Sequence, residues 1–136
     1  MATPEVTNTT ILLDNSMLEQ LSQVDPSGDL LVSLFSILNE QTKNFYNFSN
    51  ALLVQNDFMN LSREAHKLKS SFGSMGLVEL QKICKQIELL AKNSDDLTRK
   101  ERLKDLLAIY EQTYSPSMEI LKYNLNGFKH EKKTSS

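Results

Sequence analysis

Apolar residues recur along much of the chain at steps of three and four, the spacing that places side chains on one face of an α-helix. The pattern is clearest between residues 58 and 75. There the apolar positions are spaced 3, 4, 3, 4 and 3 apart and comprise Phe58, Leu61, Ala65, Leu68, Phe72 and Met75. Gly76 follows this apolar stripe, where a helix that ends in the left-handed conformation requires glycine. The pattern predicts an amphipathic helix that ends just before Gly76.

Two helices are predicted upstream of this segment. Asp14 can cap a short first helix. Its apolar residues are Met17, Leu18 and Leu21. Ser27 or Asp29 can begin a longer helix, which has an irregularity near residues 42–44 before a break at Asn56. The apolar residues of this longer segment are Leu30, Leu31, Leu34, Ile37, Leu38, Phe45, Phe48, Leu52 and Leu53.

Two further helices are predicted downstream. The first ends near Asn93, and its apolar residues are Leu80, Ile83, Cys84, Ile87, Leu90 and Ala91. The second should run from about Leu97 to Leu125. Pro116 should kink or interrupt that helix near Thr113, because proline lacks the amide donor and clashes with the preceding turn. We therefore expect helices joined by short connections.

Composition supports an all-helical fold. Only 4 of 136 residues are glycine and 3 are proline, whereas sandwiches and barrels need frequent turns built from these residues. We therefore predict an all-α fold, an antiparallel four-helix bundle with an extra short N-terminal helix. One domain should span residues 13–127, between a flexible N-terminus at 1–12 and a flexible polar tail at 128–136.

Charge and cysteine content exclude several function classes. A net charge of −2 argues against nucleic-acid binding, and the single residue Cys84, placed in an apolar stripe, should be an inert core thiol. With only one cysteine and two histidines, the usual zinc ligand sets are out of reach, and His130 in the polar tail should be a bystander. The chain shows no glycine-rich phosphate loop, membrane span or signal peptide, which predicts no ATP site, no membrane partner and a cytoplasmic location.

His66 is the main candidate for chemistry. It lies about 100° from the apolar stripe, at the boundary of the helix or outside it. Its helical neighbours are small, polar or cationic: Ser62, Arg63, Lys69, Ser70 and Gly73. Such a surface lets another protein approach the imidazole, and Lys69 could neutralise an anion held there. An ordinary surface histidine remains the alternative, and Gly73 either allows close approach or marks fraying before Gly76.

The segment from Ala65 to Leu77, AHKLKSSFGSMGL, resembles the signature of histidine-containing phosphotransfer (HPt) domains. The match comprises the Ala-His pair, an apolar residue two positions after His66, Lys69, the small residues that follow and Gly76. The next helix continues it with Leu80, Cys84 and Glu88 in the family's register. Ser70 departs from the pattern, because the family most often has glycine there. The resemblance implies a four-helix bundle that carries phosphate in phosphorelays.

The resemblance also implies roles for individual residues. His66 would accept a phosphoryl group on Nε2, and Lys69 would compensate its charge, with Lys67 and Lys92 as weaker contributors. Glu88 would accept a hydrogen bond from Nδ1–H of His66. A carboxylate at one nitrogen fixes the tautomer that leaves the other nitrogen nucleophilic. Without the family match, Glu88 would be interpreted as a solvated charge.

The implied function is that of a histidine phosphocarrier in a two-component phosphorelay, without independent catalytic turnover. Its partners would be receiver domains of response regulators or hybrid histidine kinases, which would hold Mg²⁺, so this chain, expected to be a monomer, needs no cofactor. The expected docking surface comprises Ser62, Arg63, Lys67, Ser70, Gly73, Met17 and Leu21. The alternatives are a helical adaptor or kinase-inhibitory module that carries no phosphate, and a hydrolase that pairs His66 with a serine.

Overall fold

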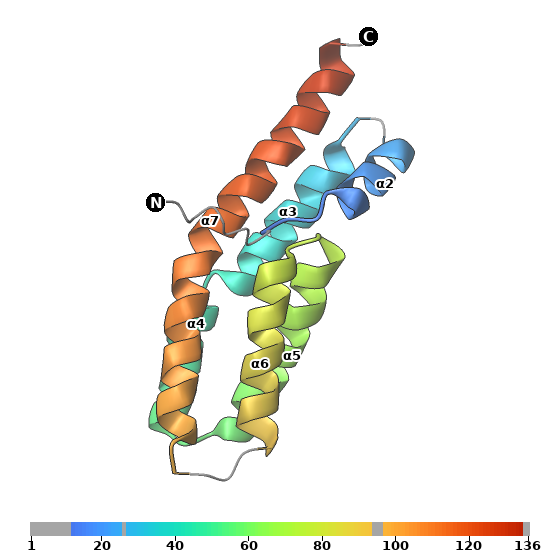
Figure 1. The fold of residues 1–136 in the computed structure, drawn as a ribbon. Helices are drawn as coiled ribbons and strands as arrows, with labels where there is room; N and C mark the ends of the chain where they lie inside the picture. The colour runs from blue at the N-terminus through green and yellow to red at the C-terminus, as the bar shows by residue number, and fades with distance from the viewer. Residues whose placement is uncertain (1–11, 26, 94–96, 135–136) are drawn as a thin grey trace, which may run out of the picture.

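The computed structural model describes residues 12–25, 27–93 and 97–134, with the backbone alone for Met17 and for residues 126–134. The described chain forms helices joined by short connections (Figure 1). The helices are α2 (Ser16–Val24), α3 (Asp29–Thr42), α4 (Phe45–Val54), α5 (Phe58–Ser74), α6 (Val78–Asn93) and α7 (Arg99–Thr134). The predicted all-α fold class is confirmed.

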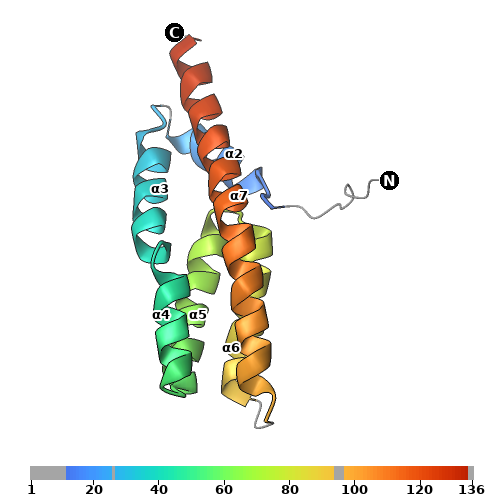
Figure 2. The same cartoon turned by 90° about the vertical axis from the view of Figure 1, so that its left-hand side faces the viewer.

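Four antiparallel legs form the bundle. Helices α3 and α4 follow one another in the first leg, and α5, α6 and α7 are the other three (Figures 1 and 2). Helix α5 packs against α4 and α6, and α7 packs against the same two helices from the opposite corner. The short helix α2 lies at one end of the bundle, beside α3. The predicted arrangement, four helices with an added N-terminal helix, is therefore present.

The first leg is divided where the sequence pattern is irregular. Helix α3 ends at Thr42, and Asn44 has φ −105° and ψ 3°, outside the range of a regular helix. The amide of Lys43 still donates to the carbonyl of Asn39 at 3.0 Å, and that of Phe48 donates to Asn44 at 3.0 Å. The two helices thus follow one another closely, and the predicted irregularity near residues 42–44 is confirmed.

The core is formed by the apolar stripe of α5 and the facing side chains of the other legs. Leu61, Ala65 and Phe72 are fully buried. Tyr110 of α7, 1% exposed, packs its ring 4.9 Å from that of Phe45 and 6.1 Å from that of Phe72, measured between centroids. Each helix thereby buries one face, which leaves the opposite face of α5 available to solvent.

The end of α5 is a glycine-dependent turn. Gly76 has φ +79°, which favours glycine, and the amide of the buried Leu77 donates to the carbonyl of Phe72 at 2.9 Å. The carbonyl of Gly76 also accepts a hydrogen bond of 2.7 Å from the amide of Asp14. The predicted end of this helix is confirmed, and the same turn fixes the chain that leads into α2.

Helix α7 is one continuous helix, and it ends later than predicted. It continues through Pro116 without interruption, and it extends to Thr134 rather than ending near Leu125. Pro116 and Gln112 are both exposed, so water can replace the amide donor that the carbonyl of Gln112 loses. Residues 128–133 contain neither proline nor glycine and include lysine and glutamate, which favour helix. The boundary predicted from the apolar pattern was therefore too early.

Some apolar residues of the first leg are exposed, contrary to the prediction from the pattern. Leu31 and Leu38, seven residues apart, face the core, whereas Leu30 and Ile37 lie one position earlier and are 45% and 53% exposed. Phe48 is likewise exposed. The apolar pattern of this segment covers a wider arc than one leg of a bundle can bury. Ile37 consequently lines a shallow groove between α3 and α5.

Candidate functional site

His66 lies in the middle of α5, with 59% of its side chain exposed. Its neighbours Ala65 and Leu68 are buried, so the backbone of the helix directs the imidazole away from the core. The predicted offset of His66 from the apolar stripe is confirmed. The imidazole is therefore open to an approaching molecule while its helix is fixed by the bundle.

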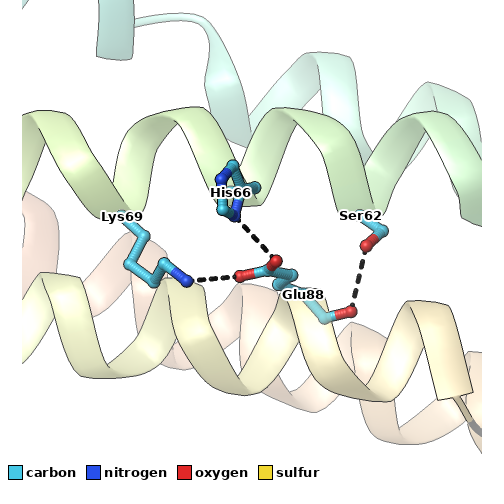
Figure 3. A network of polar contacts seen from close by, with 4 residues as sticks. All are labelled: Ser62, His66, Lys69 and Glu88. Atoms are coloured by element: carbon cyan, nitrogen blue, oxygen red, sulfur yellow. Dashed lines mark hydrogen bonds and ion pairs between the residues drawn. The ribbon is translucent and has the colours of Figure 1, made fainter.

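Glu88 of α6 contacts the imidazole from the neighbouring helix (Figure 3). Its Oε2 lies 2.8 Å from Nδ1 of His66, and its side chain is only 13% exposed. An ionised carboxylate can only accept hydrogen bonds, so Nδ1 carries the hydrogen and donates it. In the neutral imidazole this leaves the lone pair on Nε2, the nitrogen with nucleophilic character.

Lys69, one turn after His66, forms an ion pair with the other oxygen of the same carboxylate. Its Nζ lies 2.9 Å from Oε1 of Glu88, and its side chain is 25% exposed. Figure 3 shows His66 and Lys69 both directed from α5 toward Glu88. The ammonium is thus held beside the imidazole by the carboxylate that also binds Nδ1.

The ionisation of Glu88 reflects two opposing effects. Partial burial raises the pKa of Glu88, because the charged form loses hydration, whereas the contacts with Lys69 and His66 lower it. The contacts prevail, and the pKa of Glu88 lies below its ordinary value. Glu88 is therefore a carboxylate at neutral pH, the state that its geometry with His66 requires.

Ser62 secures the backbone of Glu88. Its hydroxyl donates a hydrogen bond of 3.1 Å to the main-chain carbonyl of Glu88, and the residue is only 5% exposed (Figure 3). The sequence pattern placed Ser62 on the docking surface, and the structure places it at the contact between α5 and α6, where it lines the same hollow as His66. The face of α5 that carries Ser62 turns toward α6, a fact that a helical projection of α5 alone cannot supply.

Further cationic side chains surround the imidazole. Arg63, Lys67 and Lys92 line the same shallow hollow as His66, with Lys92 projecting from α6. Lys67 pairs with Glu64 at 3.1 Å, and the guanidinium of Arg63 donates to the amide oxygen of Asn60 at 3.3 Å. The structure therefore brings the predicted cations together around an exposed imidazole.

A comparison with family models decides the classification. The model described as Hpt domain matches residues 32–113, a range that includes His66, Lys69 and Glu88. The chain belongs to the Hpt domain family. Hpt domains are phosphocarriers of two-component signalling rather than enzymes, and their partners are receiver domains. No curated protein and no solved structure gives a significant match.

The small residues of this Hpt domain occupy different environments. Ser70 is exposed, one turn after His66. Gly73 is half-buried beneath the side chain of Gln81, and a Cβ at this position would lie 2.5 Å from Nε2 of Gln81. Because α5 remains helical to Ser74, the interpretation of Gly73 as a sign of fraying was wrong. Gly73 instead admits a side chain from α6.

The first short helix carries the two apolar residues that were predicted for docking, Met17 and Leu21. Leu21 is half-buried and packs against the core of the Hpt domain, so only part of its side chain faces solvent. The side chain of Met17 lies outside the described residues. The contribution of α2 to a docking surface stays a prediction.

Cys84 lies in the core, away from the site. Cys84 is fully buried, as predicted, and burial raises the pKa of its thiol to about 12. The side chain of His130 lies outside the described residues. Within the described part of the Hpt domain, no group of three or more histidine, cysteine or acidic residues could hold a metal ion, and no helix is long and apolar enough to cross a bilayer.

Proposed function

We propose that this protein is a histidine phosphocarrier in a phosphorelay and that Nε2 of His66 is the acceptor. The phosphoryl group would come from the aspartyl phosphate of a receiver domain, or from a kinase complex, and pass to the aspartate of another receiver. The observation that carries the proposal is the 2.8 Å contact between Nδ1 of His66 and the Glu88 carboxylate. It fixes the tautomer that presents a nucleophilic Nε2 to solvent.

The transfer step conserves charge and protons. The lone pair of Nε2 forms a bond to phosphorus as the bond between phosphorus and the aspartate oxygen breaks, which leaves a carboxylate on the donor. The imidazole gains positive charge and retains its hydrogen on Nδ1, where Glu88 stabilises it. Onward transfer reverses these bond changes. The receiver supplies the Mg²⁺, and this chain contributes a positioned nucleophile.

Lys69 compensates the charge of the bound phosphoryl group in this proposal. Its flexible side chain is held on Oε1 of Glu88 in the unphosphorylated protein, and it can exchange that oxygen for a phosphoryl oxygen beside Nε2. Lys67 and Lys92 add to the positive field around the same hollow. Positioning and charge compensation are the main requirements of phosphoryl transfer, so a helical bundle without an enclosed active site is sufficient.

Transfer from a phosphorylated receiver domain tests the proposal. Purified protein is mixed with phosphorylated receiver domains, and the acid-labile phosphate bound to it is measured. We expect labelling of the wild type and none of His66→Gln. Absence of transfer to the wild type from every receiver would contradict the proposal, and so would undiminished labelling of His66→Gln. Either result would favour an adaptor that carries no phosphate.

A variant of Lys69 tests charge compensation. Lys69→Ala should slow transfer at least about tenfold with a small change in melting temperature, because Glu88 keeps its bond to His66. Lys122→Ala, at an exposed position on α7, serves as the control and should transfer normally. A large loss of thermal stability in Lys69→Ala would show a structural role instead.

A further inference from the structure

Two shallow hollows lie between α5 and α6, on either side of the ion pair between Lys69 and Glu88. The first contains His66, as described above. The second is lined by Lys69, Val78, Gln81, Lys82 and Lys85, so α6 provides most of its surface. The proposed transfer chemistry uses the first hollow and the ammonium group of Lys69, and it gives no role to Lys82 or Lys85.

The face around these hollows is positively charged although the chain as a whole is not. The cations are Arg63, Lys67, Lys69, Lys82, Lys85 and Lys92, and the carboxylates that pair with them or lie among them are Glu64, Glu79 and Glu88. Six cations against three carboxylates give this face an excess of three positive charges. The net charge of the whole chain is −2, so positive charge is concentrated beside His66.

Lys82 and Lys85 contribute little to the stability of the fold. The side chain of Lys82 is 66% exposed, and its ion pair with Glu79 spans 3.5 Å between neighbours on one helix turn, an arrangement that contributes little stability. Lys85 is exposed and forms no ion pair with the described part of the chain. Both ammonium groups are therefore available to a partner that covers the second hollow.

We propose that Lys82 and Lys85 extend the docking surface from α5 onto α6 and select receiver domains that present carboxylates beside their phosphorylation site. This inference rests on the proposed function, which makes a receiver domain the partner at His66. Charge complementarity identifies the occupant: an acidic protein surface matches an exposed, cationic face that lies on the approach to the imidazole.

Solvated charges at the rim of an interface act mainly on the rate at which the two partners associate. They attract a partner of opposite charge over a distance of about 8 Å at physiological salt, and they raise the association rate more than they strengthen the bound complex. Lys82 and Lys85 should therefore determine which receivers bind and how strongly binding depends on salt. They should leave the reactivity of Nε2 unchanged, because Lys69 and Glu88 lie between them and the imidazole.

Charge reversal tests this inference against a matched control. The double variant Lys82→Glu, Lys85→Glu is compared with Lys104→Glu, Lys122→Glu, which changes the net charge equally at exposed positions on α7, the helix diagonal to α5. The probes are Mg²⁺-loaded, unphosphorylated receiver domains, with binding measured by calorimetry at low and high salt. Phosphoramidate, a small donor that needs no docking, measures the reactivity of His66 independently.

We expect the α6 double variant to bind receivers at least about tenfold more weakly at low salt and within about twofold of wild type at high salt. The α7 double variant should bind like wild type, and phosphoramidate should label all three proteins equally. Equal binding by the two double variants, a loss that persists at high salt, or absence of salt-dependent receiver binding by the wild type would overturn the inference.

The same experiment separates this inference from the proposed function. Salt-dependent binding that is lost in the α6 variant, without phosphate on His66 from any donor, would refute the carrier function and leave the docking surface in place. Normal transfer from receivers to His66 in the α6 variant would leave the carrier function in place and refute the role of Lys82 and Lys85.

Discussion

The hydroxyl of Ser62 donates a hydrogen bond of 3.1 Å to the main-chain carbonyl of Glu88, whose carboxylate in turn binds His66. The three residues join α5 and α6 in a closed path, since Ser62 and His66 lie one turn apart on α5. Glu88 is thus held at both ends, through its backbone and through its side chain. This arrangement fixes the distance between the imidazole and its carboxylate independently of any partner.

Replacement of Ser62 by alanine should weaken this path. Ser62→Ala removes one partly buried hydrogen bond and should lower the free energy of unfolding by about 1 kcal/mol, with transfer a few-fold slower because Glu88 is held less firmly. Denaturant unfolding and receiver-to-His66 transfer measure the two effects. Ser115→Ala, at an exposed position on α7, is the control, and equal losses in both variants would contradict the prediction.

Replacement of Glu88 by glutamine separates orientation from charge. Glu88→Gln keeps an oxygen that accepts from Nδ1–H but loses the ion pair with Lys69, whereas Glu88→Ala loses both contacts. We expect transfer rates in the order wild type, Glu88→Gln, Glu88→Ala. Single-turnover transfer measurements provide the check, and equal rates for glutamine and alanine would show that the bond to Nδ1 contributes nothing.

The lowered pKa of Glu88 gives stability a defined pH dependence. A carboxyl group whose pKa is lower in the folded than in the unfolded protein stabilises the fold above its ordinary pKa of 4.5. This contribution should disappear as pH falls from 4.5 through the lower native pKa, because the unfolded chain then binds the proton more tightly. Across this range, the free energy of unfolding measured with denaturant should decline less steeply with falling pH for Glu88→Gln than for wild type. Identical slopes would exclude the effect.

Replacement by alanine should have opposite effects on the stability of the fold at two glycines. In Gly73→Ala the new Cβ displaces only the flexible end of Gln81, and removal of a helical glycine stabilises by up to about 1 kcal/mol. In Gly76→Ala the Cβ meets the backbone oxygen of Asp14 at a residue with φ +79°, so a loss of at least about 1–2 kcal/mol is expected. Thermal melting of both variants is the test, and a stabilised Gly76→Ala would disprove it.

Cys84 should resist modification in the native protein. Burial raises the pKa of its thiol to about 12, so thiolate is scarce near neutral pH and reagents cannot reach it. Iodoacetamide labelling should be slow in buffer and fast in denaturant, as followed by mass spectrometry. Rapid labelling of the folded protein would show that this part of α6 opens.

The periodic pattern predicted local structure well because that structure depends on residues within a single helix. The stripe of α5, its end at Gly76 and the outward direction of His66 all depend on residues within a few turns of one another. The end of α7 was placed too early, because the apolar pattern fades where the helix leaves the bundle although residues 128–133 still favour helix.

The period of the apolar residues cannot predict contacts between helices. Glu88 lies 22 residues from His66, and only the packing of α6 against α5 brings them together, so the family resemblance alone indicated Glu88. Ser62 was placed on the outer surface because its position on α5 does not reveal which side α6 covers. The exposure of Ile37 depends in the same way on how much of α3 its neighbours cover.

The close approach of Asp14 to Gly76 has a mechanical consequence. The turn that ends the helix of His66 also seats the start of α2 through a 2.7 Å backbone hydrogen bond. Displacement of α2 by a bound molecule would therefore break this hydrogen bond or pull on the turn that ends α5. The route from α2 to the histidine is thus short: one hydrogen bond to Gly76, which lies ten residues after His66 along the chain.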